Sequence, residues 1–235
     1  MNEPAERSSS LKAFDCPGRY EDARGSESIT WTVLPSTRGS PPGQAGFELH
    51  TAIRGVPYWG YCLEGLSTDD MEAATNAGLP EDLGESSAMP HQLSGDLPLL
   101  LDKRGEQIKT VVSFLLNEPP PTWNDPDGKY LRLSITVDAQ KYEVWHEWFE
   151  DGLQRLEGEL PEGVTFVCCV TCLYSDYSPA GHGLLGMFCH RGAKAQYLAV
   201  RSKSDYFKVP RTEEVMETHV CPEFQRRIPG TGYRG

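Results

Sequence analysis

The sequence CCVTC at residues 168–172 holds the densest group of cysteines in the chain. Within it, Cys169 and Cys172 form a C-x2-C pair, whose short loop lets two thiolates face one ion. Cys189 and Cys221 follow at wider spacings and could complete a set of four sulfur ligands. Zinc prefers tetrahedral sulfur sets of this kind. We therefore expect Zn²⁺ as a structural cofactor of the C-terminal part of the chain.

The cysteine pattern leaves the identity of one ligand open. Cys168 stands directly beside Cys169, although a strand at this point would direct the two side chains to opposite faces. Three histidines lie close enough in the sequence to replace one thiolate: His182, His190 and His219. A closed set of four protein ligands would be structural, because metal catalysis requires an open coordination position.

Two other uses of the cysteines compete with metal binding. Buried free cysteines are common small core residues. A C-x2-C pair can also perform thiol redox chemistry, but such pairs usually begin a helix that lowers a thiol pKa. Here residues 173–186 contain Pro179 and three glycines, which is typical of a loop. The spacing therefore favours a metal over a redox pair.

Length and composition indicate a globular protein of the cytoplasm. The chain has 235 residues, which is enough to bury a large core without help from a metal. We find no apolar run approaching the roughly 18 residues of a membrane span, and residues 1–10 lack the apolar core of a secretory signal. In the cytoplasm thiols stay reduced, so clustered cysteines favour metal over disulfides.

The charge of the chain bears on its partners. A formal net charge of −12 argues against nucleic acid and anionic membranes, since both attract basic surfaces. Residues 190–235 contain nine Lys and Arg against five Asp and Glu, a net of +4, which leaves −16 on residues 1–189. The two parts could attract each other, or the acidic surface could bind a basic partner. We expect that partner to be another protein.

Alternation of apolar and polar residues predicts an α+β protein made mainly of antiparallel strands. The alternation is clearest in residues 131–137, and strands at the observed spacing are typical of a sandwich-like fold. The predicted strands cover residues 30–34, 47–53, 58–63, 97–101, 108–116, 131–137 and 164–170, with a returning strand through Tyr142 and Val144. The predicted helices cover residues 68–77 and about 145–157.

The same patterns divide the chain into three parts. Residues 1–28 are polar and predict a flexible leader, residues 29–164 a β-rich domain, and residues 165–235 a cysteine-rich module packed on it. Within the β-rich domain, residues 79–96 have the composition of an acidic loop. The terminal RRIPGTGYRG, residues 226–235, is either a flexible tail or a segment that folds back over the module.

One loop carries the residue types of an acid–base or nucleophilic site. Asp176, Ser178 and His182 lie close together in the sequence beside the cysteines. They could serve a small hydrolase or transferase, but we find no G-x-S-x-G, P-loop or H-E-x-x-H motif that would name a reaction. The other interpretation, which we favour, is that these short polar side chains support the backbone around the thiolates. A G-x-G-x-x-G match at 181–186 lacks the βαβ context that such a motif requires.

The C-terminal blocks resemble a known sequence signature. CxxCLYSDYSPAGHGLLGMFCHR and ETHVCPEFQRRIPGTGYRG are similar to an uncharacterised bacterial family of unknown function, whose signature runs as cysteines, SDYSPxGxGxxG, CxR, ETYLCPEF and PGTGYRG. That signature has cysteines where Cys172, Cys189 and Cys221 stand, and one more at Cys169 or close by. The resemblance implies a shared ligand set and implies no activity.

Together these observations lead to two function hypotheses. The first is a non-enzymatic, zinc-stabilised binding protein that acts on another protein, for example an acidic inhibitor of the immunity or antitoxin type. The second is the small hydrolase or transferase that would use the loop beside the metal. A closed four-sulfur site favours the first, and a three-ligand metal in a cleft favours the second.

Overall fold

The structure, a computed structural model, describes residues 12–36, 46–83, 91–117, 130–177, 186–231 and 233. All statements below concern these residues. Their strands are β1 Phe14–Asp22, β2 Gly25–Ser36, β3 Gly46–Ile53, β4 Val56–Gly60, β5 His91–Lys103, β6 Glu106–Leu116, β7 Leu131–Val137, β8 Gln140–His146, β9 Val164–Phe166, β10 Ser175–Asp176, β11 Met187–Cys189 and β12 Glu213–Val215.

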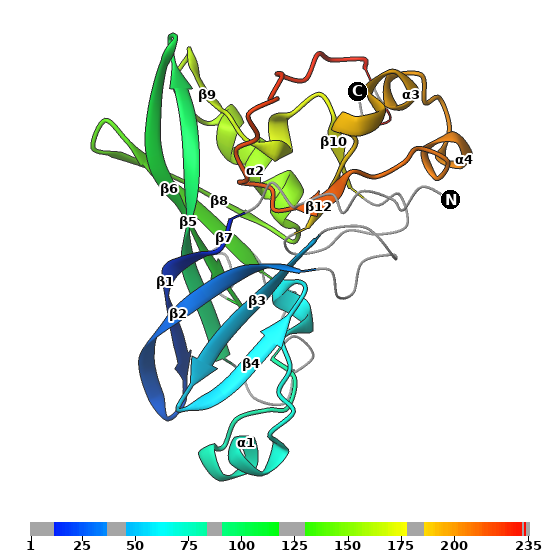
Figure 1. The fold of residues 1–235 in the computed structure, drawn as a ribbon. Helices are drawn as coiled ribbons and strands as arrows, with labels where there is room; N and C mark the ends of the chain where they lie inside the picture. The colour runs from blue at the N-terminus through cyan, green and yellow to red at the C-terminus, as the bar shows by residue number, and fades with distance from the viewer. Residues whose placement is uncertain are drawn as a thin grey trace, which may run out of the picture.

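The helices are few and short, as Figure 1 shows. The α-helices are α1 Met71–Ala77, α2 Phe149–Gly158, α3 Lys194–Leu198 and α4 Lys203–Tyr206. Three 3-10 turns accompany them: η1 Leu63–Gly65, η2 Cys169–Thr171 and η3 Arg191–Ala193. Among the described residues, no helix is both long enough and apolar enough to span a membrane.

Nine of the described strands form one antiparallel sheet, which confirms the predicted α+β class. The order is β4-β3-β2-β1-β5-β6-β7-β8, with β9 paired to β5. Instead of two stacked sheets, this single sheet bends so that its two halves share one core (Figure 1). A smaller sheet of β10, β11 and β12 lies in the C-terminal part.

The polar leader predicted for residues 1–28 is wrong over its second half. β1 pairs with β2 along its whole length and with β5 through Gly18 to Asp22. Its inward face contributes only Cys16 and Tyr20 as large buried side chains, at 5% and 1% exposure. The outward residues are charged or proline, so too few apolar positions exist to reveal the alternation. Residues 1–11 lie outside the described part.

The predicted loop at residues 79–96 also ends earlier than expected, because β5 begins at His91. Its inward positions include Leu93 and Leu97, but Gly95 stands between them and weakens the apolar pattern. Gly95 is opposite Gly18 of β1. A side chain at either position would meet the Trp31 indole, which fills the space between the two strands and donates to the Ser94 carbonyl at 2.9 Å.

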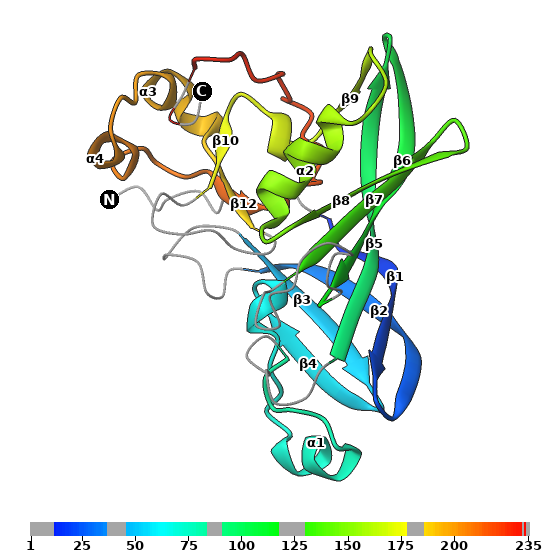
Figure 2. The ribbon, with the colours of Figure 1, turned by 180° about the vertical axis from the view of Figure 1, so that it is seen from behind.

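Helix α2 begins later than the stripe starting at Trp145 predicted. Trp145 lies on β8 opposite Arg132, and the helix begins at Phe149. Its buried residues are Phe149, Leu153 and Leu156, among others, and the helix packs against β7 and β8; Figure 2 shows α2 beside these strands from behind. Gly152 allows this close approach, because a Cβ atom there would lie 2.9 Å from a methyl of Leu133.

The strand predicted for residues 164–170 is shorter in the structure. β9 ends at Phe166, where the Thr171 hydroxyl donates to the Phe166 carbonyl at 2.9 Å and to the Cys168 carbonyl at 3.2 Å. These contacts close a tight turn, and pairing with β5 ends with the hydrogen bond from the Val167 N–H to the Leu100 carbonyl at 2.8 Å. Packing is continuous across the predicted boundary between residues 164 and 165, because Cys168 and Val170 belong to the main core.

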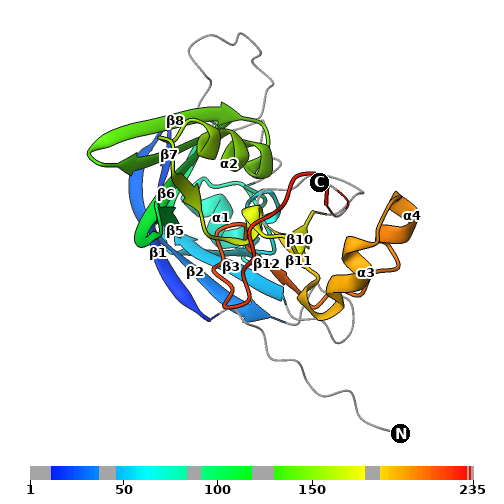
Figure 3. The same ribbon diagram turned by 90° about the horizontal axis from the view of Figure 1, so that it is seen from above.

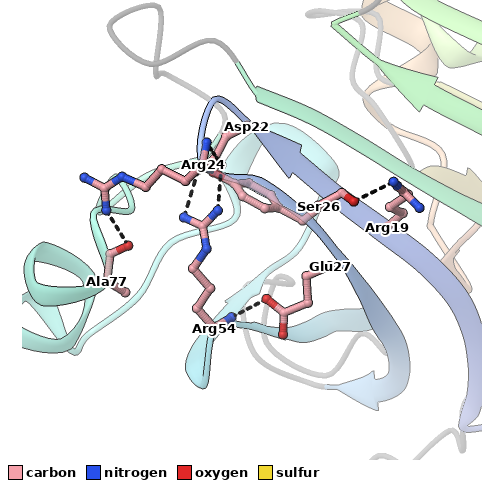
Figure 4. A network of polar contacts seen from close by, with 8 residues as sticks. Arg19, Asp22, Arg24, Ser26, Glu27, Arg54 and Ala77 are labelled. Atoms are coloured by element: carbon pink, nitrogen blue, oxygen red, sulfur yellow. Dashed lines mark hydrogen bonds and ion pairs between the residues drawn. The ribbon is translucent and has the colours of Figure 1, made fainter.

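A polar network joins strands at the end of the sheet that is distant from residues 168–172 (Figure 4). The Arg54 guanidinium donates to both carboxylate oxygens of Asp22, at 2.9 and 2.6 Å, and the Arg54 backbone N–H donates to Glu27 at 2.8 Å. Arg24 reaches the Ala77 carbonyl at the end of α1. α1 lies within the helix predicted for residues 68–77; it begins after Asp70, whose side chain accepts from the Ala73 N–H, and ends before Gly78, which is in the left-handed region.

Candidate metal centre

Three separate segments meet where the predicted ligands lie. Cys169 and Cys172 stand at the two ends of η2, Cys189 ends β11, and Cys221 follows β12. The segments are joined by backbone hydrogen bonds: the Cys169 N–H donates to the His219 carbonyl at 2.9 Å and the Val170 N–H to the Glu217 carbonyl at 2.9 Å. Figure 3 shows the short strands of this region side by side.

The four predicted ligands are buried but belong to two clusters: Cys169, Cys189 and Cys221 pack together, whereas Cys172 packs with Leu173 and Tyr174. Burial raises the pKa of the Cys169 thiol well above its usual value, and the charges of Cys172, Cys189, Cys168 and Cys221 raise it further. Cys168 contributes to this shift as well as the three other predicted ligands, so the shift does not single out one ligand set. The exposed fractions of the four side chains are between 1% and 6%.

A guanidinium group that the sequence did not suggest lies against two of the sulfurs. The Nη1 atom of Arg191 is 3.7 Å from the Cys189 sulfur and 3.9 Å from the Cys221 sulfur. The same side chain pairs with the buried Glu213 and lies 3.8 Å from Glu223. A fixed positive charge here would offset the negative charge of thiolates.

Backbone N–H groups also point at the sulfurs. The Glu223 N–H donates to the Cys221 sulfur at 3.3 Å, and the Arg191 N–H bonds to the Cys189 sulfur. In both cases the donor is two residues after the cysteine. Such bonds favour the thiolate form, but burial still raises the pKa of Cys189 to about 11. In the protein without a metal this thiol is therefore protonated at neutral pH.

Cys168 packs in a different cluster from the other nearby cysteines, in line with the expectation that it faces the opposite side. Its side chain is fully buried in the main core, whereas Cys169 packs with Cys189 and Cys221 in a separate cluster. Burial raises the pKa of Cys168 to about 12. Cys168 is thus the least suited of the five nearby cysteines to join a ligand set.

Of the three histidines considered as replacements for a thiolate ligand, two lie among the described residues. Both ring nitrogens of His190 are engaged: Nδ1 lies 3.1 Å from the Pro210 carbonyl and Nε2 lies 3.0 Å from the Tyr206 hydroxyl. Burial lowers the pKa of His190 to about 4, so it is neutral. Burial also lowers the pKa of His219. His182 lies outside the described residues.

The side chains do not form a finished ligand set. Among the described residues, no group of three or more His, Cys, Asp and Glu side chains is arranged to hold a metal ion as the structure stands. Backbone pairing brings the segments of the four predicted cysteines side by side, but their side chains do not form such a group. Zinc binding thus stays a prediction.

Asp176, from the proposed acid–base loop, is buried and hydrogen-bonded within the protein. It has no exposed surface, and its two carboxylate oxygens accept hydrogen bonds from the Tyr197 hydroxyl at 2.8 Å and the Tyr177 N–H at 2.9 Å. Burial raises its pKa. Ser178 and His182 lie outside the described residues, so the structure does not show whether they approach Asp176.

The C-terminal segment folds back over this region, which resolves the alternative left open by the sequence. The Leu173 N–H donates to Gln225 and the Arg227 N–H donates to Thr171, so the end of the chain runs beside η2. Arg226 binds both carboxylate oxygens of Glu157 on α2, each at 2.8 Å.

Another buried carboxylate, that of Glu217, was not foreseen. Glu217 has no exposed surface and accepts hydrogen bonds from the Tyr177 hydroxyl at 3.0 Å and the Gly186 N–H at 3.1 Å. Burial raises the pKa of Glu217 to about 7. Sequence gave no signal for this contact, because 40 residues separate Glu217 from Tyr177.

Comparison with known proteins identifies a family but no activity. No curated protein and no solved structure matches the chain. Residues 15–175 match the family described as "Family of unknown function (DUF6304)". The match extends from β1 to β10, so it includes the β-rich part and the first cysteines, whereas Cys189 and Cys221 lie beyond it. Because more than half of the chain is matched, this protein belongs to the family of unknown function DUF6304.

Proposed function

We propose that Cys169, Cys172, Cys189 and Cys221 bind one structural Zn²⁺ ion and that the protein is a non-enzymatic binding protein. The supporting observation is that backbone hydrogen bonds bring three chain segments together and that the four cysteines on them are buried. Binding would require the sulfurs to turn toward a common point. The four thiols would lose their protons to the ion as it binds.

The surroundings of the cysteines suit a thiolate site. Four thiolates around Zn²⁺ carry a net charge of −2, and Arg191 between two of the sulfurs would offset part of it. The N–H groups of Arg191 and Glu223 would bond to metal-bound sulfur, which is the usual outer support of a zinc site. With four protein ligands the ion would have no open position for substrate, so its role would be structural.

The binding role rests on charge. The formal net charge is −12, and the negative groups are concentrated before residue 190. An acidic surface favours a partner with a basic surface, and we propose another protein, bound in the manner of an immunity or antitoxin-type inhibitor. The hydrolase or transferase alternative receives less support, because Asp176 is fully buried and both of its carboxylate oxygens accept hydrogen bonds.

The metal proposal can be tested by elemental analysis of protein purified without added metal. We expect about one zinc per chain in the wild type and loss of zinc in Cys172→Ser. Cys168→Ser is the matched control, since it replaces a neighbouring buried thiol that faces the main core, and it should keep the metal. Absence of zinc and iron from native wild-type protein, or equal zinc loss in both variants, would contradict the proposal.

The partner proposal requires a separate experiment. Native protein should be isolated from its source with crosslinking, and the bound proteins identified by mass spectrometry. We expect a basic partner whose affinity falls as salt is raised from about 50 to 500 mM, since exposed charges are screened. A complex that is insensitive to salt, or turnover of a small molecule by the isolated protein, would contradict the charge-based binding role.

A further inference from the structure

The outer face of the large sheet contains a cavity that the metal proposal does not use. Its volume is about 450 Å³, and it is lined by residues of β1, β2, β5, β6 and β7. This volume falls within the roughly 300–1,000 Å³ typical of small-molecule sites. None of the cysteine segments contributes to the lining.

Short side chains in the middle of adjacent strands create the hollow. Ser94 on β5, Ser113 on β6 and Ser134 on β7 line it, and Ser113 is directly opposite Ser134 in the strand register. Longer side chains, Arg19 on β1 and Arg132 on β7, stand around them. Thr and other bulkier residues are the common choices for strands, so three serines at the centre of one face leave space above the backbone.

The divergence of β1 from β5 deepens this hollow. Pairing between the two strands stops at Gly18 and Gly95, and both glycines line the cavity. Both glycines face the core, where a Cβ atom would collide with the Trp31 indole, so they line the cavity with backbone atoms. Pro17, Phe114 and Leu115 add an apolar wall next to the serines.

The lining combines hydroxyl groups with balanced charge. Asp96 accepts a hydrogen bond from the Ser113 hydroxyl at 2.5 Å, and Arg19 lies 3.4 Å from Glu21. Two arginines therefore face two carboxylates, so the cavity favours neither anions nor cations. Serine hydroxyls both donate and accept, which suits a ligand that has many groups of the same kind.

The geometry points to a binding site for a neutral, polyhydroxylated ring molecule the size of a mono- or disaccharide. Its hydroxyl groups would bond to Ser94, Ser134 and Asp96, and its C–H face would lie on the wall containing Pro17. A phosphate-bearing ligand would meet the carboxylates, and a purely apolar ligand would leave the serine hydroxyls without water or partner. This site is independent of zinc.

Titration of the full chain, as purified, with named probes tests the site. We would measure saturation-transfer NMR and calorimetry with D-glucose, D-galactose, N-acetyl-D-glucosamine and maltose, and with glycine and inorganic phosphate as non-sugar probes. At least one sugar should bind, and Ser134→Val should weaken it by about tenfold or more, since the valine fills the hollow and removes a hydroxyl. Ser94→Val, on a neighbouring strand, should do the same.

Thr136→Val is the matched control, because Thr136 is an exposed residue on the same face of β7 that does not line the cavity. It should leave sugar affinity unchanged, and thermal melting would show whether each variant is folded. The proposal would be overturned if no sugar bound at tens of millimolar, if only glycine or phosphate bound, or if folded Ser134→Val and Ser94→Val bound as well as Thr136→Val.

Discussion

The large sheet and the C-terminal segments that cover it are stabilised in different ways. The sheet and α2 share one extensive apolar core that includes Trp31, Leu133 and Phe166. The C-terminal part has two small clusters, of seven and six buried residues, and four of these thirteen are cysteines. It also buries Asp176 and Glu217 completely. The sheet is therefore stabilised mainly by hydrophobic burial, whereas the C-terminal part relies more on polar contacts, to which we propose that a metal is added.

Removal of the proposed metal should have the largest effect on stability. Structural zinc contributes about 10–16 kcal/mol in small zinc-binding peptides. We predict that Cys172→Ser, or a strong chelator, makes the amides of residues 168–233 exchange rapidly with solvent, while the amides of β5 and β6 stay protected. Hydrogen-exchange mass spectrometry measures both regions at once. Equal protection of both regions in Cys172→Ser would contradict the proposal that the metal stabilises the C-terminal part but not the sheet.

A core substitution in the sheet should lower the stability of the sheet without removing the proposed metal. Leu133 is fully buried and contacts Gly152 of α2. Leu133→Ala should lower the free energy of unfolding by about 2–5 kcal/mol. Chemical denaturation measures this loss, and zinc content of the folded protein should not change. A loss of zinc in folded Leu133→Ala would show that the sheet and the metal site are coupled more closely than we propose.

The buried carboxylate of Glu217 should make stability fall with rising pH. Its pKa in the folded protein is about 7, above the usual 4.5, so folding favours the protonated form. Below about pH 4.5 the group costs nothing, and between pH 4.5 and 7 the folded state loses stability, of the order of 3 kcal/mol in total. Glu217→Gln should therefore be more stable than the wild type at pH 8 and equal to it near pH 4.5.

Urea denaturation at several pH values measures this difference. Glu159→Gln, which changes an exposed carboxylate at the end of α2, serves as the control and should follow the wild type. If Glu217→Gln were less stable than the wild type at pH 8, the charge would be stabilising and the buried polar contacts would have to be reinterpreted.

The smallest expected effect concerns the Asp22–Arg54 pair at the far end of the sheet. Hydrogen bonds from Arg54 lower the pKa of Asp22 from 3.8 to about 2. The pair therefore stabilises the fold above pH 4, and this stability is lost as the pH falls toward 2. Arg54→Ala should cost about 1 kcal/mol at neutral pH and flatten the stability profile between pH 4 and 2. A profile as steep as that of the wild type would contradict this assignment.

The sequence predicted the strands whose apolar residues alternate without interruption. The hairpin of β5 and β6 and the strand β7 are examples, as is α1 with its aspartate cap and terminal glycine. β1 and the start of β5 escaped prediction, because glycines at Gly18 and Gly95 replace apolar residues where the Trp31 indole fills the space. The helix at α2 was predicted four residues early, since Trp145 continues its stripe but belongs to β8.

The candidate site shows a similar division. The spacing of the cysteines predicted one group of four residues, and the structure places the segments that contain them side by side. Spacing could not indicate Arg191 as a neighbour of two sulfurs, nor the contact of Glu217 with Tyr177, because both depend on how β11 and β12 pair. The outer cavity was also hidden, since it arises from the register of serines on separate strands.

X-ray absorption at the zinc edge, on native protein purified without added metal, tests the central claim most directly. We predict a shell of four sulfur atoms at about 2.3 Å from the zinc. A spectrum dominated by nitrogen or oxygen neighbours, or a sample without bound zinc or iron, would contradict the claim that four cysteines hold the C-terminal part together.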